Sequence, residues 1–176
     1  MTHEGSLLTD VSKIFNGEVS EIPFEFDIVP ENTEKEDLFF PEPVKVTGKV
    51  SEKAKGVGKT DGYVELEFTV SGSYNTHCAR CAKDLSGNIS VSKKYGVTKR
   101  LENDSDDFIE VGNGLLDVYE YASSAFYLEL PAKVLCKDDC KGLCPVCGSD
   151  LNERNCSCKK NIGANTLEGL KKLLDN

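Results

Sequence analysis

The sequence has no tryptophan among its 176 residues and no long apolar run. No stretch approaches the roughly 20 consecutive apolar residues that a membrane-spanning helix needs. Residues 1–20 lack the basic start and the apolar run of roughly 7–15 residues that mark a secretory signal. We therefore expect a cytoplasmic protein that does not interact with a membrane.

The sequence is equally poor in catalytic patterns. Its two histidines, His3 and His77, belong to no metalloprotease motif, and there is no serine nucleophile signature. Gly56–Thr60 superficially resembles a phosphate-binding loop, but Lys53 stands where the first glycine of that loop belongs. We therefore predict that the protein is not an enzyme and has no small-molecule substrate.

The sequence has fewer basic than acidic residues: it contains 21 lysines and arginines and 30 aspartates and glutamates, which gives a net charge of −9. Such a balance argues against a chain that coats nucleic acid by bulk electrostatics. The acidity lies within residues 1–130, whereas residues 131–176 hold eight basic and six acidic side chains. The two parts of the chain therefore differ in their electrostatic character.

Apolar and polar residues alternate in several runs, which is the pattern of half-buried β-strands. A turn signal, Asp61-Gly62, precedes the third run and predicts a hairpin. These runs predict an antiparallel sheet that could curl into a partly open barrel. They cover residues 22–28, 44–50, 64–70, 89–97 and 108–111.

Helical spacing of apolar residues appears in three other segments. It predicts a short helix over 6–17, a long helix from Leu115 that ends before Pro131, and a terminal amphipathic helix over 166–174. The acidic run 102–107 is typical of a solvated loop. We therefore expect an α+β fold, with a β-rich acidic region at 1–114 and a helical, cysteine-rich region at 115–176. Zinc is expected to tie these regions into one folding unit.

Eight cysteines are the most informative feature of the sequence. In a reducing compartment, metal binding or thiol chemistry explains them better than disulfides do. A tetrahedral zinc ion takes four thiolates, so that eight cysteines make two complete sets. The predicted zinc ligands are Cys78, Cys81, Cys136, Cys140, Cys144, Cys147, Cys156 and Cys158.

Three pairings of the four cysteine pairs are possible. We favour one local set formed by 144, 147, 156 and 158, because it closes a short loop at low entropic cost. Cys78 and Cys81 would then join Cys136 and Cys140. A redox Cys-x-x-Cys motif, iron–sulfur ligation and a replacement ligand at His77 remain alternatives.

Several motifs in the second half of the chain resemble the YceD family of bacteria and plastids. They are Cys78-Ala79-Arg80-Cys81, Leu128-Glu129-Leu130-Pro131, the string Leu135–Gly148, Asp150-Leu151-Asn152 and Cys156-Ser157-Cys158. The resemblance is to the cysteine-rich branch, since not every member keeps the full string. It implies a role in the accumulation of large-subunit ribosomal RNA through its synthesis, processing or stability, and a link to genes for a large-subunit ribosomal protein.

Two mechanisms follow for such a ribosome-biogenesis factor. In the first, the protein contacts ribosomal RNA or large-subunit assembly intermediates directly through basic side chains near the zinc-binding end. The candidates are Lys93, Lys94, Lys99, Arg100, Arg154, Lys159 and Lys160. In the second, its acidic surface binds a basic ribosomal protein or assembly factor, and the effect on RNA is indirect.

Overall fold

The computed structural model describes residues 5–30, 38–53, 63–100 and 108–158. Its residues group into two compact units, Met1–Thr76 with Leu85–Ala132 and His77–Asp84 with Lys133–Asn176. The helix that follows Leu115 thus groups with the sheet and not with the cysteine-rich segment. The division at residue 114 and the single zinc-tied folding unit stay predictions, because a grouping of contacts does not test how the chain folds.

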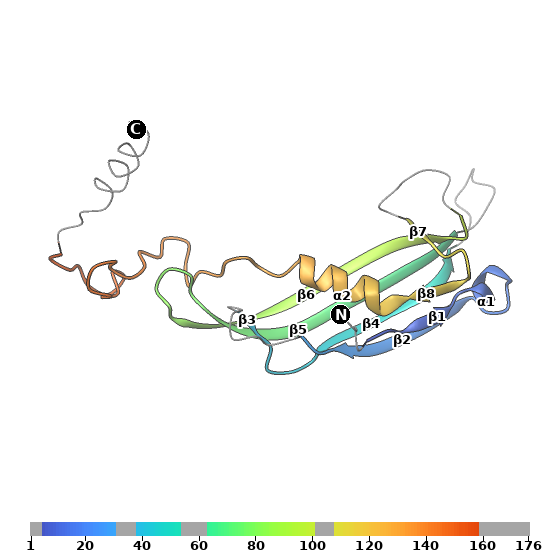
Figure 1. Cartoon of the computed structure of the whole chain (residues 1–176), viewed down its shortest axis with the longest axis horizontal. Coiled ribbons are helices and arrows are strands. Elements are labelled where there is room, and N and C mark those ends of the chain that lie inside the picture. The colour runs from blue at the N-terminus through green and yellow to red at the C-terminus, as the bar shows by residue number, and fades with distance from the viewer. Residues whose placement is uncertain (1–4, 31–37, 54–62, 101–107, 159–176) are drawn as a thin grey trace, which may run out of the picture. The chain divides into compact units, whose positions relative to one another are not determined.

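The first unit is built on a six-stranded sheet, shown in Figure 1. β2 pairs antiparallel with β4, and β4 pairs antiparallel with β5, so the predicted strands are confirmed. The hairpin turn predicted at 55–62 lies outside the described residues. The strand order is β2 (Glu21–Ile28), β4 (Val44–Lys53), β5 (Tyr63–His77), β6 (Asp84–Thr98) and β7 (Phe108–Glu110), and β3 (Leu38–Phe39) also pairs with β5.

The expectation of a wholly antiparallel sheet is wrong at its last strand. β7 pairs parallel with β6, with Gly96 opposite Phe108 and Thr98 opposite Glu110. Alternating hydrophobicity reports which side of a strand is buried but carries no information on strand direction. Over the described residues the sheet stays open, since β2 pairs with β4 alone, and no barrel closes.

A second, two-stranded sheet replaces parts of two predicted helices. β1 (Leu8–Asp10) pairs antiparallel with β8 (Leu115–Asp117), so that only Ser12–Phe15 of the predicted helix over 6–17 is helical, as α1. In β1 the buried residue is Thr9, and Leu8 is exposed. Strand pairing between distant segments therefore overrides the local helical spacing of apolar residues.

The long helix predicted after Leu115 is shorter than expected, because α2 spans Val118–Leu128. Its apolar side packs on one face of the sheet through three aromatic contacts: Tyr119 with Phe26, Tyr121 with Tyr95, and Phe126 with Phe40. The described fold is thus mostly sheet with two helices, which matches the α+β expectation only in part. The predicted terminal helix and the loop 102–107 lie outside the described residues. No helix of the described part of the chain could span a membrane.

The opposite face of the sheet is polar. Along β5 the residues Val64, Leu66, Phe68 and Val70 are buried, and the residues between them point to the other side. There, Lys94 lies 2.8 Å from Glu67, and Lys53 lies 3.1 Å from Glu65. Pairs of this exposure each contribute at most about 1 kcal/mol. Burial under α2 therefore supplies most of the stability of the sheet.

Asp117 joins β8, α2 and the chain before β1. Its carboxylate accepts hydrogen bonds from the Tyr119 N–H at 3.1 Å, the Leu7 N–H at 3.0 Å and the Ser6 hydroxyl at 2.7 Å. Burial alone would raise the pKa of Asp117, but these hydrogen bonds together lower it below its usual range. The carboxylate is therefore an N-cap that is more stable in its charged form.

Replacing this cap should destabilise the first unit. Asp117→Ala is expected to lower its free energy of unfolding by about 1 kcal/mol at neutral pH, measured by denaturant titration. Since the folded protein lowers the pKa, this contribution is complete above the ordinary carboxyl pKa of 3.8 and is lost as the pH falls through the lower folded value. Asp117→Asn should retain most of the cap and lose this pH dependence. An unchanged stability in the alanine variant would contradict the assignment.

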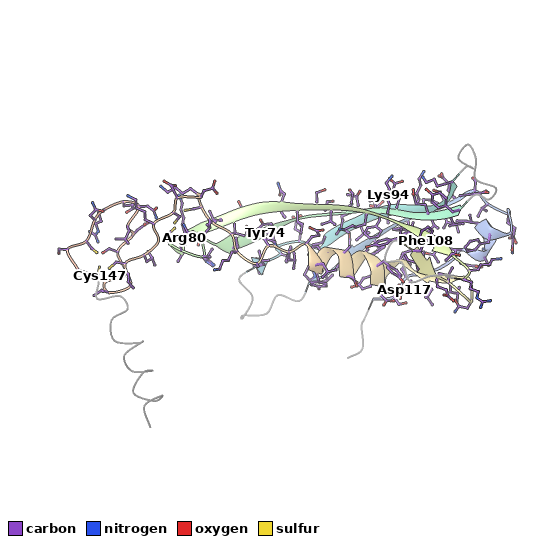
Figure 2. All side chains as sticks on the ribbon, turned by 90° about the horizontal axis from the view of Figure 1, so that it is seen from above. Tyr74, Arg80, Lys94, Phe108, Asp117 and Cys147 are labelled. Atoms are coloured by element: carbon purple, nitrogen blue, oxygen red, sulfur yellow. The ribbon has the colours of Figure 1, made fainter. Side chains whose placement is uncertain are left out.

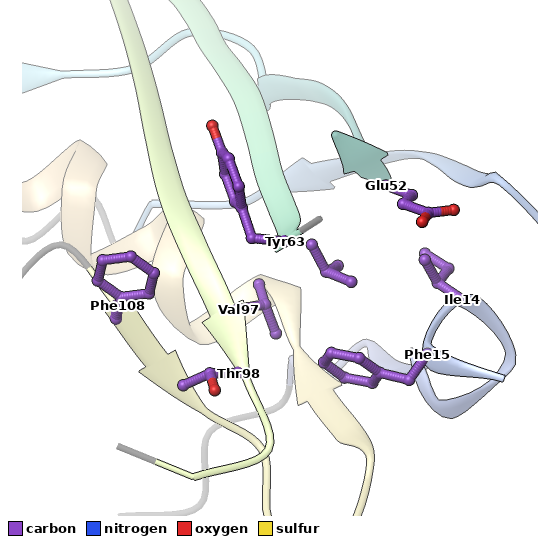
Figure 3. A pocket seen from close by; sticks show the side chains of 8 residues that line it. Ile14, Phe15, Glu52, Tyr63, Val97, Thr98 and Phe108 are labelled. Atoms are coloured by element: carbon purple, nitrogen blue, oxygen red, sulfur yellow. The ribbon is translucent and has the colours of Figure 1, made fainter. Parts of the chain in front are cut away.

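A small hollow lies at one end of the sheet, as Figure 3 shows. Its volume is about 240 Å³, and α1, β4, β5, β6 and β7 all contribute to its lining. Phe15, Tyr63 and Phe108 supply aromatic surface, and Glu52 is the single carboxylate among the lining residues. This set offers no metal donors comparable with the cysteines of the second unit.

Candidate metal centres

The first cysteine cluster combines two segments that are far apart in the sequence. Cys78 and Cys81 lie in the turn between β5 and β6, and Cys136 and Cys140 lie in the segment that follows the first unit. All four sulfur atoms lie within 4.8 Å of one another. This first tetrad joins the two cysteine pairs that the favoured sequence pairing brings together, and it lies entirely within the second unit.

The sulfur separations of the first tetrad fit one tetrahedral metal ion. The Sγ atoms of Cys78 and Cys140 are 3.8 Å apart, and those of Cys81 and Cys136 are 3.6 Å apart. A tetrahedron with metal–sulfur bonds of about 2.3 Å has edges of about 3.8 Å. These separations are too long for disulfide bonds of about 2.05 Å. Ligands of an iron–sulfur cluster bind different irons and would stand farther apart, so the spacing favours a single ion.

Backbone and side-chain hydrogen bonds hold the two halves of the first tetrad together. The Ala79 N–H donates to the Val134 carbonyl at 3.0 Å. The Arg80 guanidinium donates to the Cys140 carbonyl at 2.9 Å and to the Asp138 carbonyl at 3.3 Å. Arg80, labelled in Figure 2, thus positions the second cysteine pair without being a ligand itself.

The second tetrad is local. Cys144, Cys147, Cys156 and Cys158 again place all four sulfurs within 4.8 Å, in agreement with the favoured sequence pairing. A tight turn aims the first two, since the Gly148 N–H donates to the Cys144 carbonyl and the Cys144 N–H donates to the Ser149 carbonyl, both at 2.8 Å. Gly148 has a φ of +70°, a conformation that favours glycine.

Asn152 connects the loop of the second tetrad to the first one. Its amide nitrogen lies 3.4 Å from Cys140 Sγ and 2.7 Å from Asp150 Oδ1, and its amide oxygen accepts the Lys141 N–H at 2.9 Å. An N–H donor to a metal-bound thiolate offsets part of its negative charge. Asn152 is therefore a positioning residue for Cys140.

The thiols of each tetrad have divergent acidities. The Cys136 N–H donates to Cys78 Sγ at 3.4 Å, and this bond contributes most to lowering the pKa of Cys78 to about 6. Burial and the neighbouring sulfurs raise the pKa of Cys136 to about 12. In the second tetrad, hydrogen bonding with Ser149 lowers the pKa of Cys147 to about 6, and Cys147 in turn raises the pKa of Cys158 to about 12.

This divergence has a simple electrostatic cause. Thiolates within 4.8 Å of one another repel, so the ionisation of one sulfur opposes the ionisation of its neighbours. A divalent cation at the centre would remove the repulsion and deprotonate all four. The donor set therefore fits a soft or borderline divalent ion such as zinc.

The two tetrads differ in their exposure. Cys78, Cys81 and Cys140 of the first tetrad are 2%, 8% and 3% exposed. In the second tetrad Cys144 is buried, Cys147 is exposed, and the other two are half-buried. Solvent and competing ligands thus have easier access to the second tetrad, near the Cys147 label in Figure 2.

His77 is not part of either tetrad. Its Nε2 lies 3.2 Å from Asp84 Oδ1, and its side chain is 67% exposed. Each tetrad is complete with cysteines alone, so a replacement ligand is unnecessary.

The candidate RNA-binding side chains have varied environments. In the first unit, Lys93 lies 2.9 Å from Glu129, Lys94 lies 2.8 Å from Glu67, and the Lys99 ammonium lies 5.1 Å from the ring centre of Phe15. Arg100 is exposed, and in the second unit Arg154 lies 3.4 Å from Ser149 Oγ. Lys159 and Lys160 lie outside the described residues, and RNA binding by this set stays a prediction.

The cysteine spacing predicts the two groups of cysteines but not the residues that contact and position them. Neither Arg80 nor Asn152 was assigned a role from its spacing, although both stand in the motifs that carry the family resemblance. Two features of the sequence could have indicated these roles. Arg80 stands between Cys78 and Cys81, and Asn152 follows the turn at Cys147-Gly148. Their contacts depend on the three-dimensional approach of distant loops.

The chain thus combines a sheet-based unit with a unit that holds two cysteine tetrads, each of which could hold a metal ion. The model of the family described as "Large ribosomal RNA subunit accumulation protein YceD" matches residues 66–174, which include both tetrads. The chain belongs to this YceD family.

Individual relatives share shorter segments with the chain. An uncharacterized protein of Mycobacterium leprae is 30% identical over 89 residues, which are 47% of this chain and 41% of that protein. One of Mycobacterium tuberculosis is 31% identical over 88 residues and 42% of its length. The chloroplastic YCED homolog 1 of Arabidopsis thaliana, named a large ribosomal RNA subunit accumulation protein, is 35% identical over 43 residues, 24% of this chain and 13% of that protein. The chain thus spans less than half of the length of these relatives, and no solved structure matches it.

Proposed function

We propose that this protein is a non-enzymatic factor that supports the accumulation of large-subunit ribosomal RNA in the cytoplasm, with structural zinc in both tetrads. The observation that carries the proposal is the pair of complete cysteine tetrads within the region that matches the YceD family. The names of the family and of its Arabidopsis relative supply the connection to ribosomal RNA. No separate catalytic constellation has been identified among the described residues.

Zinc has a clear structural role in this proposal. Cys78, Cys81, Cys136 and Cys140 would hold one ion, and Cys144, Cys147, Cys156 and Cys158 would hold the other. The described residues of the second unit contain neither helix nor strand beyond the ends of β5 and β6, so little else orders this segment. The ions would supply the cross-links that a small domain without a large core needs.

Two zinc ions on eight thiolates also change the charge of the protein. The thiolates add eight negative charges and the ions four positive ones, so the formal charge of −9 becomes about −13. Lys93 and Lys94 already have carboxylate partners. Both facts support the second mechanism, in which an acidic surface binds a basic ribosomal protein or assembly factor.

The accumulation role can be tested in cells. Depletion of the protein should lower the ratio of large-subunit to small-subunit ribosomal RNA, and the wild-type gene should restore it. Cys140→Ser should fail to restore the ratio, whereas the exposed-surface control Leu128→Ala should restore it fully. A ratio that does not respond to depletion would contradict the proposed function.

The mode of action can be separated from the role itself. The zinc-loaded chain is titrated with large-subunit RNA transcripts over a salt series, beside small-subunit transcripts of matched length. Direct phosphate contact predicts an affinity that falls as salt rises, with a slope that counts the contacts. The protein-mediated mechanism predicts no specific binding at low salt and capture of a basic large-subunit protein instead.

Gly142 provides a test of how the first tetrad is held. It has a φ of +72°, and a Cβ at this position would lie 2.8 Å from the Arg80 carbonyl oxygen. Gly142→Ala should weaken zinc binding by the first tetrad, measured by competition with a chelator. Gly148→Ala is the matched control, because Gly148 has a φ of +70° and no atom would lie within 4 Å of its Cβ. Both variants bear the strain of positive φ, about 1–2 kcal/mol, and only Gly142→Ala adds a clash. Equal effects at the first tetrad would contradict this account.

A further inference from the structure

Among the strands that the structure describes, none pairs with most of the outer edge of β6. β7 pairs with Gly96–Thr98 of β6, and no other strand of the described residues pairs with that side of β6. With respect to the described part of the chain, the stretch Asp84–Tyr95 is therefore an unpaired edge, and Figure 1 shows β6 at the border of the sheet. An unpaired edge presents backbone N–H and C=O groups that can pair with another strand.

The register of β6 fixes which residues point outward. The hydroxyl oxygens of Thr69 and Ser92 are 2.9 Å apart, Lys94 lies 2.8 Å from Glu67, and the Lys83 carbonyl accepts the Cys78 N–H, three contacts that fit one register of β5 against β6. The Thr98 carbonyl accepts the Val111 N–H on the β7 side. Outward and inward groups alternate along an antiparallel strand. The even-numbered residues of β6 therefore present their backbone groups at the free edge.

The middle of this edge lacks the usual features that prevent strand addition, and its charged residues stand only near the two ends. Residues 85–92 contain no proline and no charged side chain. The opposite border of the sheet, β2, has Pro23 at its middle together with Glu21, Glu25 and Asp27. Prolines and charges are the common protection of edge strands. The β6 edge is therefore better suited than the β2 edge to pair with a strand of another chain.

We propose that the β6 edges of two copies of this chain pair antiparallel about Ile89 and form a two-fold symmetric dimer with a continuous sheet. In this register Ser90 lies opposite Asn88 of the second copy, and Ser92 lies opposite Ser86. All these residues are even-numbered, so that their outward backbone groups meet. This inference does not depend on the proposed function.

Charge complementarity favours this register, and it favours a second copy of the chain as the partner that pairs with the β6 edge. It places Lys94 opposite Asp84 of the other copy, and the two-fold axis repeats the pair. Asp84 contacts His77 and Lys94 contacts Glu67 within the single chain, but the two side chains are 93% and 60% exposed, so both can turn to the facing charge of the second copy. Directly opposite charges on one face of a sheet attract, and like charges repel.

The side chains on the other face also fit. Ile89 would lie opposite Ile89 of the second copy, and Val91 would lie opposite Gly87, where the Tyr74 ring of the same chain covers the glycine and offers an apolar surface. Ile89 and Val91 are already 8% and 6% exposed in the single chain, so the pairing extends an existing core. The uncharged stretch lets two chains of net charge −9 approach at this edge.

The oligomeric state of the full-length, zinc-loaded chain tests the proposal by sedimentation velocity over a concentration series. The wild type should shift from monomer to dimer as its concentration rises. Ser90→Pro removes one outward N–H and should weaken dimerisation, whereas Ser90→Ala keeps this donor and should not. A wild type that stays monomeric throughout, or a dimer that Ser90→Pro leaves unchanged, would overturn the proposal.

A charge swap tests the proposed register independently, and it does not require that the proline variant folds. Asp84→Lys places lysine opposite lysine in its homodimer, and Lys94→Asp places aspartate opposite aspartate. Each variant alone should dimerise about tenfold more weakly than the wild type. An equimolar mixture restores two attractive pairs and should dimerise at least as well as the wild type. A mixture no more dimeric than the separate variants contradicts this register.

Discussion

Cys140→Ser is expected to remove one of the two proposed zinc ions and to unfold the part of the second unit around the first tetrad. Cys140 is 3% exposed, and its sulfur lies 3.8 Å from Cys78 Sγ. A serine hydroxyl does not replace a thiolate as a zinc ligand under neutral conditions. Binding of structural zinc contributes about 10–16 kcal/mol in small zinc domains, so its loss exceeds the stability of a segment of this size.

Amide hydrogen exchange locates the effect, and Cys147→Ser is the matched control. In Cys140→Ser the hydrogen bonds from Cys78 N–H to Lys83 and from Ala79 N–H to Val134 should lose their protection. In Cys147→Ser the amides of Cys144 and Gly148 should lose protection instead. Loss of the same amides in both variants would contradict two separate sites.

Phe126→Ala should produce a large loss of stability in the first unit. Phe126 is fully buried on the inner side of α2, and its ring centre lies 5.4 Å from that of Phe40 in an edge-on arrangement. Removing a buried phenyl ring costs its transfer free energy and leaves a cavity between helix and sheet. The free energy of unfolding should fall by about 3–5 kcal/mol, measured by denaturant titration.

Leu128→Ala is the control on the same helix. Its side chain is 85% exposed, so that its truncation leaves no cavity and should change the stability by less than about 0.5 kcal/mol. Comparable losses in both variants would show that α2 does not pack on the sheet through Phe126. Neither substitution should change the amount of bound zinc, because both positions lie in the first unit.

The strands of the sheet could be predicted because their burial largely follows a two-residue period. Along β5 each buried residue from Val64 to Val70 alternates with a polar one. The parallel pairing of β7 could not be predicted, since alternation does not encode direction. The β1–β8 pair was missed for a related reason, because Leu8 and Leu115 match a helical period while their backbones pair across the chain.

The cysteine groups could be predicted because their chemistry limits the choice. Four thiolates per ion and the short spacing from Cys144 to Cys158 leave one economical grouping, and the structure has it. The supporting contacts could not be predicted. The reach of Arg80 to two carbonyls and of Asn152 to Cys140 depends on how loops approach in space, which spacing does not specify.

Native mass spectrometry of freshly purified, reduced protein tests the central claim most directly. The account predicts a chain that carries two zinc ions, one for each tetrad, and that loses both with acid or a strong chelator. Reconstitution with zinc should restore the same mass. A metal-free chain that also fails to take up added zinc would contradict the account.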